Sequence, residues 1–162
     1  KIIISTRSCI SMTEEELEII IREISGGDQL IGSISQQILN SYRNKDYFLS
    51  FLGLGVLVDQ SIRLYADMAE GRFEDGLQIV LDKRFITESE ANTLGLVINL
   101  RDQINNAYMY SSVIELPENG EMEPYPFHED GTWEKIVTKN IHKIFVILSN
   151  LKNKQEFRLN QD

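Results

Sequence analysis

The chain has 162 residues, with 16 lysines and arginines against 25 aspartates and glutamates, and a formal net charge of −9. This length suits one domain with a sizeable core, and 42% hydrophobic against 25% charged residues argues against a wholly disordered chain. The single cysteine excludes an intramolecular disulfide framework, and the negative charge opposes non-specific binding to nucleic-acid backbones.

The first residues are expected to lie outside the folded domain. Residues 1–11 contain no methionine, whereas Met12 directly precedes Thr13-Glu14-Glu15-Glu16, a capping-box pattern that predicts the start of a helix. We therefore expect 1–11 to be a disordered leader, or sequence added upstream of a natural start at Met12. The leader is too short and polar for a secretory signal. With a single cysteine in the chain, the reducing cytoplasm is the expected compartment.

Helical periodicity predicts the first three elements of the domain. They cover residues 13–26, 30–42 and 46–69. Gly53 and Gly55 lie inside the third helix, where a glycine costs about 1 kcal/mol relative to alanine, so we attribute both to close contact with neighbouring helices. Asp59 and Arg63 are predicted to pair one turn apart on the same helix. No stretch reaches the roughly 20 consecutive apolar residues of a membrane span, and no membrane contact is expected.

Further helices and an acidic loop complete the prediction. Helices are expected over 73–83, 87–105 and 133–151, an acidic loop over 115–132 and a flexible tail over 153–162. Thr87 and Glu90 form a second capping-box pattern, and the loop holds all three prolines. Neither strand alternation nor an internal repeat is evident. The predicted fold class is therefore all-α, a single helical bundle of five or six helices over 12–152.

The end of the fifth predicted helix resembles a known motif. Arg101, Asn106 and Tyr108 match the spacing Arg-x4-His-x-Tyr of HEPN domains (higher eukaryotes and prokaryotes nucleotide-binding), except that asparagine replaces histidine. Upstream, Gly71-Arg72-Phe73, the helix start at 85–90 and Leu100-Arg101-Asp102 are similar to the mannitol operon repressor branch of HEPN-like proteins. The resemblance covers about residues 46–110 and implies a HEPN-like helical bundle that commonly pairs as a dimer.

The histidine replacement bears directly on activity. In a metal-independent RNase an imidazole accepts the proton of the ribose 2′-hydroxyl, while arginine stabilises charge on the phosphate. Asn106 does not titrate near neutral pH. The resemblance thus implies a non-catalytic regulatory protein, as in transcriptional regulation or toxin–antitoxin systems, that binds a protein partner through Arg101, Asp102, Asn106 and Tyr108. The alternative is a HEPN-type RNase acting on RNA, naturally weakened or engineered inactive at Asn106.

A purely structural role for Arg101 also stays open, because an arginine near a helix C-terminus can satisfy the last carbonyl groups and the helix dipole.

Two charged features accompany the motif. Three lysines are spaced one turn apart on the last predicted helix: Lys135, Lys139 and Lys143. They form a basic stripe that binds nucleic acid, an acidic partner or the acidic loop, or they are a solvated face of the helix. Residues 102–134 contain eight acids and no lysine or arginine. That stretch is a solubilising surface, a docking surface of the kind an acidic antitoxin or nucleic-acid mimic would use, or a cover for Arg101 and the lysines.

No cofactor is expected, since the sequence has no phosphate-binding loop and no nucleophile elbow. His128 beside Glu129 and Asp130 lacks a second histidine nearby in sequence, so no metal site is expected either. Four aromatic residues are predicted to lie in the core: Phe48, Phe51, Tyr65 and Phe145.

Overall fold

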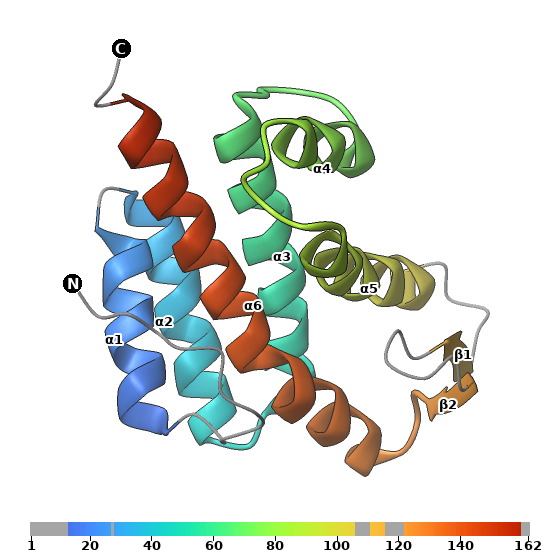
Figure 1. Ribbon diagram of the computed structural model, residues 1–162. Helices are drawn as coiled ribbons and strands as arrows, with labels where there is room; N and C mark the ends of the chain where they lie inside the picture. Colours follow the sequence, from blue (N-terminus) through green and yellow to red (C-terminus); the bar gives the residue numbers. More distant parts are fainter. Residues whose placement is uncertain (1–12, 27, 106–110, 116–121, 160–162) are drawn as a thin grey trace.

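The computed structural model describes residues 13–26, 28–105, 111–115 and 122–159 (Figure 1). Six helices dominate these residues and confirm the all-α bundle. They are α1 (Glu14–Ser25), α2 (Gln29–Arg43), α3 (Tyr47–Ala66), α4 (Phe73–Asp82), α5 (Glu88–Asn105) and α6 (Asp130–Leu159). A short hairpin, β1 (Ser111–Glu115) and β2 (Met122–Pro126), joins α5 to α6 in the sequence.

Both predicted capping boxes form. At the start of α1 the backbone N–H of Glu16 donates to Thr13 Oγ1 at 3.2 Å, and the N–H of Thr13 donates to Glu16 Oε2 at 2.8 Å. Before α5, Thr87 and Glu90 exchange the same two hydrogen bonds at 2.8 and 3.2 Å. Each box satisfies amide groups that have no partner within the helix, which explains why both helices begin where the sequence predicts.

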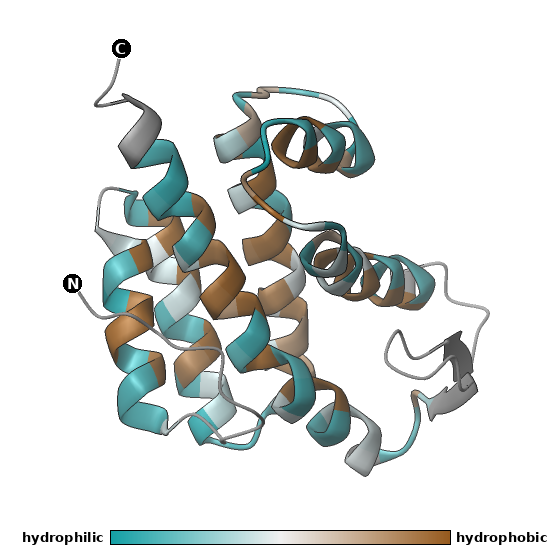
Figure 2. Cartoon of the chain, in the orientation of Figure 1, coloured by the Kyte–Doolittle hydropathy of each residue, from teal (hydrophilic) through white to brown (hydrophobic). Residues whose placement is uncertain are grey.

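Helix α3 is the centre of the bundle and packs against α2, α4, α5 and α6. It is long and apolar enough to cross a membrane by length and composition alone. Its buried side chains account for much of that apolar character, as expected of a central bundle helix: Phe51, Leu54, Leu57, Val58, Ile62, Tyr65 and Ala66. Figure 2 shows the apolar positions gathered on the helix sides that face the bundle interior.

The two glycines of α3 lie where other helices approach closely, as predicted. A Cβ atom at Gly53 would lie 2.6 Å from Ile38 Cγ1 on α2, and one at Gly55 would lie 2.9 Å from Arg101 Cδ on α5. Distances this short are not tolerated between carbon atoms. The absence of a side chain at these positions therefore lets α2 and α5 pack against opposite sides of α3.

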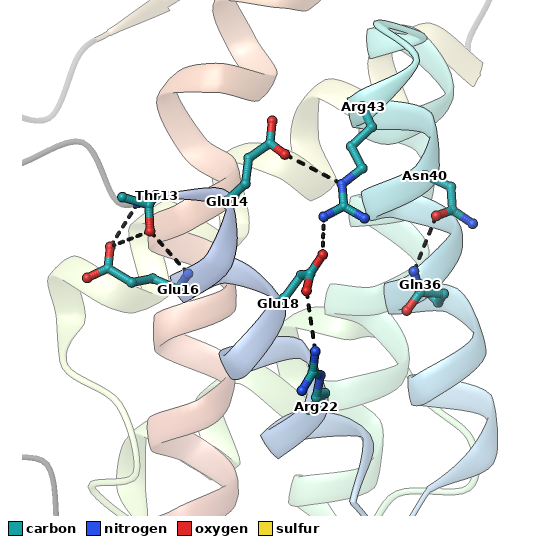
Figure 3. Close-up of polar contacts among 8 residues, drawn as sticks. All are labelled: Thr13, Glu14, Glu16, Glu18, Arg22, Gln36, Asn40 and Arg43. Atoms are coloured by element: carbon teal, nitrogen blue, oxygen red, sulfur yellow. Dashed lines mark hydrogen bonds and ion pairs between the residues drawn. The ribbon is translucent and has the colours of Figure 1, made fainter.

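An ionic cluster joins α1 to α2 (Figure 3). The carboxylate of Glu18 forms ion pairs with Arg43 on α2 and, at 3.3 Å, with Arg22 one turn along α1. Arg43 also lies 3.5 Å from Glu14. The pKa of Glu18 is lowered, chiefly by its hydrogen bond with Arg43 and by the charge of that arginine. The cluster aligns the polar sides of the two helices above their shared core.

The region after α5 requires corrections to the prediction. Instead of an uninterrupted loop over 115–132, β1 pairs antiparallel with β2, with Val113 opposite Pro124. Proline has no N–H to donate, so the prolines of this segment argued against a strand. In a hairpin each strand has one unpaired edge, and proline is tolerated there. Helix α6 also begins at Asp130, before the predicted start at 133.

The far end of α6 differs from the prediction as well. The helix continues to Leu159, so a flexible tail from 153 is wrong over 153–159. Lys152 Nζ donates to the carbonyl oxygens of Glu23 and Gly26, at 2.5 and 2.8 Å, and Lys154 Nζ donates to that of Phe85 at 2.8 Å. These bonds attach the end of α6 to the end of α1 and to the α4–α5 connection. The polar residues at the end of α6 predicted no packing, because the sequence does not show which backbone groups the lysine side chains contact.

One predicted core residue is misplaced. The side chain of Phe48 is 40% exposed, and its ring lies edge-on to Trp133 with 5.0 Å between ring centroids. Phe51, Tyr65 and Phe145 are buried as predicted.

Candidate functional site

Arg101 lies near the end of α5 and points across α3. Its Nη1 donates to the backbone oxygen of Gly55 at 3.3 Å, in the space left by that glycine. Its Nε donates to Asp102 Oδ1 at 3.1 Å, and Nη2 lies 3.0 Å from the same oxygen. The Arg101 side chain is 21% exposed, against 52% for that of Asp102. The guanidinium group therefore connects two helices and is partly neutralised by its neighbour.

This geometry differs from the simple capping role considered for Arg101. The carbonyl that it binds belongs to α3, whereas a capping arginine would bind the last carbonyl groups of its own helix. The predicted Asp59–Arg63 pair is present on α3 at 3.2 Å, and Arg63 Nη1 donates to the carbonyl of Gly71 at 2.8 Å. That pair therefore fixes the turn that leads to α4, at a different place from Arg101.

The structure brings together only part of the predicted motif. Arg101 and Asp102 are adjacent and share a hydrogen bond. Asn106 and Tyr108 lie outside the described residues, between α5 and β1. Gln103, also on the last turns of α5, has a buried Oε1 atom without a hydrogen-bond partner among the described residues.

The basic stripe lies on α6, apart from the helix that carries Arg101. Lys135, Lys139 and Lys143 are all exposed, on the side of α6 opposite the buried positions Val137 and Ile141. His142 borders the stripe but is partly buried. Burial lowers the pKa of His142, while the carboxylate of Glu16 on α1 acts in the opposite direction. The side chain therefore belongs to the contact between α1 and α6 rather than to the exposed basic surface.

Two hollows on the surface were not predicted from the sequence. One, of about 550 Å³, lies between α4 and α5 and is lined by Phe73, Leu77 and Gly95 among others. The other, of about 490 Å³, lies where α3 and α6 begin, beside Phe48 and Trp133. Helical periodicity shows which positions face a core, but it does not show that two neighbouring helices leave a space between them.

The second hollow is bordered by an aromatic cluster around Trp133, the only tryptophan of the chain. The Trp133 ring stacks on Phe127, with 5.3 Å between centroids and an angle of 16° between the rings, and its Nε1 donates to the Phe127 carbonyl at 3.2 Å. These contacts attach the end of the hairpin to the bundle.

The residues described by the structure hold no group of three histidine, cysteine, aspartate or glutamate side chains arranged to bind a metal ion. Comparison of the chain with protein-family models, with curated proteins and with solved structures finds no match.

Proposed function

We propose that the chain is a non-catalytic, cytoplasmic regulatory protein of HEPN-like type, which acts by binding a protein partner, as transcriptional regulators or members of toxin–antitoxin pairs do. The observation that carries this proposal is the position of Arg101. Its side chain is only 21% exposed, and its guanidinium group is already bonded to a backbone carbonyl and to a carboxylate.

Those partners make Arg101 a poor receptor for a phosphate. A catalytic arginine must direct donors toward the charge that develops in the transition state. Here the adjacent Asp102 carboxylate would repel a phosphate, and reorienting the side chain would break its bond to Gly55. Asn106 supplies no titrating base for the 2′-hydroxyl proton. Both features favour binding over cleavage.

The distribution of charge supports the choice of a protein as partner. Eight acids and no lysine or arginine occupy 102–134, directly after the motif arginine. Such a stretch repels RNA and attracts a basic protein surface.

From the HEPN resemblance we also propose that two copies of the chain pair.

The proposal is tested by incubating the purified protein with labelled single-stranded RNA in the presence of EDTA. We expect the wild type to cleave no faster than Arg101→Ala, with both at the level of RNA alone. Metal-independent cleavage by the wild type that is lost in Arg101→Ala would instead establish an RNase, and the non-catalytic proposal would be abandoned.

A further inference from the structure

Helices α4 and α5 lie on the same flank of α3 (Figure 1). A groove lined by residues of both helices lies between them. Its volume is about 550 Å³. The two walls are formed by residues spaced one helical turn apart: Phe73, Leu77 and Leu81 on α4, and Ala91, Gly95 and Asn99 on α5. From Phe73 to Leu81 the groove follows α4 for about 12 Å, or a little over two turns of helix.

The groove has an apolar base and a polar rim. Phe73 and Ala91 are each 7% exposed and form part of the core, while Leu77 is half-buried at the wall. Gln78 and Asn92 are exposed and supply side-chain amides along the edge. An apolar floor with hydrogen-bonding edges is the pattern that receives the apolar side of an amphipathic helix.

No close contact within the described part of the protein requires a glycine at position 95. It lies in the middle of α5, yet a Cβ atom there would meet no described atom within 4 Å beyond the backbone of its own helix. By contrast, Gly53, Gly55 and Gly76 each face a side-chain atom at 3.0 Å or less. Gly131, in the first turn of α6, shares the open surroundings but not the mid-helix position. The open space above Gly95 permits close approach of a second backbone.

The two helices that form the groove are strongly acidic. They carry six acids, namely Glu74, Asp75, Asp82, Glu88, Glu90 and Asp102. Their only basic residue is Arg101, which is directed to α3. Lys83 and Arg84 lie in the connection between the helices, and the Lys83 ammonium group lies 5.9 Å from the centroid of the Phe85 ring. Among the residues that the structure describes, Glu74 is the one charged residue that lines the groove itself.

We propose that the α4–α5 groove binds an amphipathic helix of the protein partner, with its apolar stripe against Phe73, Leu77 and Gly95 and with lysine or arginine residues on its flanks. The apolar base provides affinity, Gly95 allows the partner backbone to come close, and the acidic helices select a basic sequence. This inference rests on the proposed function, because it names the surface and the chemistry of the partner.

Two labelled model peptides, each about five helical turns long, test the groove. Both have the same leucine stripe at helical spacing; one has lysine flanks and the other glutamate flanks. Fluorescence anisotropy measures binding to the intact chain at physiological ionic strength. We expect the lysine peptide to bind at least about tenfold more tightly than the glutamate peptide. Failure of the lysine peptide to bind, or equal binding of both peptides, would overturn the proposal.

Gly95→Leu places a side chain in the groove and is expected to weaken the affinity for the lysine peptide by about tenfold or more. The matched control is Gln37→Leu, which places the same side chain at an exposed position of α2 and should leave binding unchanged. Thermal unfolding by circular dichroism verifies that both variants are folded. A folded Gly95→Leu that binds as well as the wild type would contradict the proposal, as would an equal loss in the control.

Light scattering on the same proteins distinguishes a partner helix from a second copy of this 18.7 kDa chain. If Gly95→Leu converts a wild-type dimer to a monomer, the groove holds a second copy and the proposal is wrong. The RNA-cleavage assay is independent of the groove. Cleavage by the wild type would remove the proposed function, whereas unchanged peptide binding by Gly95→Leu would remove only this inference.

Discussion

Arg101 depends on a residue that has no side chain. Its Cδ atom lies 2.9 Å from the place where a Cβ of Gly55 would lie, and its Nη1 donates to the oxygen of that same glycine. The sequence drew attention to both residues separately, Gly55 as a site of close helix contact and Arg101 as part of a motif. Their contact depends on how α5 crosses α3, and helical periodicity does not report crossing geometry.

Replacing Arg101 tests this structural role. We expect Arg101→Ala to lower the free energy of unfolding by about 1–2 kcal/mol, because the hydrogen bond to Gly55 and the packing of the aliphatic stem are both lost. Urea denaturation measures the change. Asp102→Ala, at a more exposed position, is the comparison and should cost less. An unchanged stability in Arg101→Ala would show that the contact with α3 contributes nothing.

Glycine-to-alanine replacements should have opposite signs at two positions. At Gly95 the added methyl group meets no described atom within 4 Å beyond its own helix backbone, so better helix propensity should raise the free energy of unfolding by about 0.5–1 kcal/mol. At Gly53 the methyl group would overlap Ile38, which is only 1% exposed and has no room to move, so stability should fall by up to about 2 kcal/mol.

Urea unfolding of the two variants beside the wild type measures both changes. A loss of stability in Gly95→Ala would show that the space above this residue is occupied in the free protein, and the groove would then need another explanation.

Among the secondary-structure elements, helix starts were the most predictable features. Thr13 and Thr87 each precede a glutamate by three residues, and this spacing alone specifies the capping hydrogen bonds. The hairpin and the end of α6 were not predictable in this way. The pairing of β1 with β2 crosses a proline-rich segment, and the last turns of α6 are held by Lys152 and Lys154 through contacts with residues distant in the sequence.

The contact between α1 and α2 should make stability depend on pH through Glu18. Its pKa is lowered from the ordinary value of 4.5, first by the hydrogen bond with Arg43. A carboxyl group whose folded pKa is lowered contributes stability that is fully present above its unfolded pKa and is lost as the pH falls through the folded pKa.

We therefore expect Glu18→Gln to be less stable than the wild type at pH 7, with the difference shrinking as the pH falls below about 4.5. Urea unfolding at several pH values measures this. Glu15→Gln, at an exposed acid of the same helix, is the control. A difference between Glu18→Gln and the wild type that is independent of pH would contradict the assignment to the ion pair with Arg43.

In the whole molecule, the net charge of −9 is distributed unevenly, and both the candidate site and the groove lie in acidic parts of the chain. The motif arginine is bonded within the bundle, the groove lies between the two acidic helices α4 and α5, and a run of acids follows α5. The fold class and most of the helices were predictable from periodicity. For the candidate site, the sequence predicted which residues to consider but not their role, because that role depends on the contacts that each side chain makes in the fold.

We propose that this bundle binds a protein partner and does not cleave RNA. The most direct measurement is the cleavage rate of labelled RNA by excess wild-type protein in EDTA, followed from about pH 5 to pH 9, the range in which a catalytic base of the histidine type would titrate. We predict a rate equal to that of RNA alone at every pH. A protein-dependent rate that changes with pH and disappears in Arg101→Ala would instead show that the protein is an RNase.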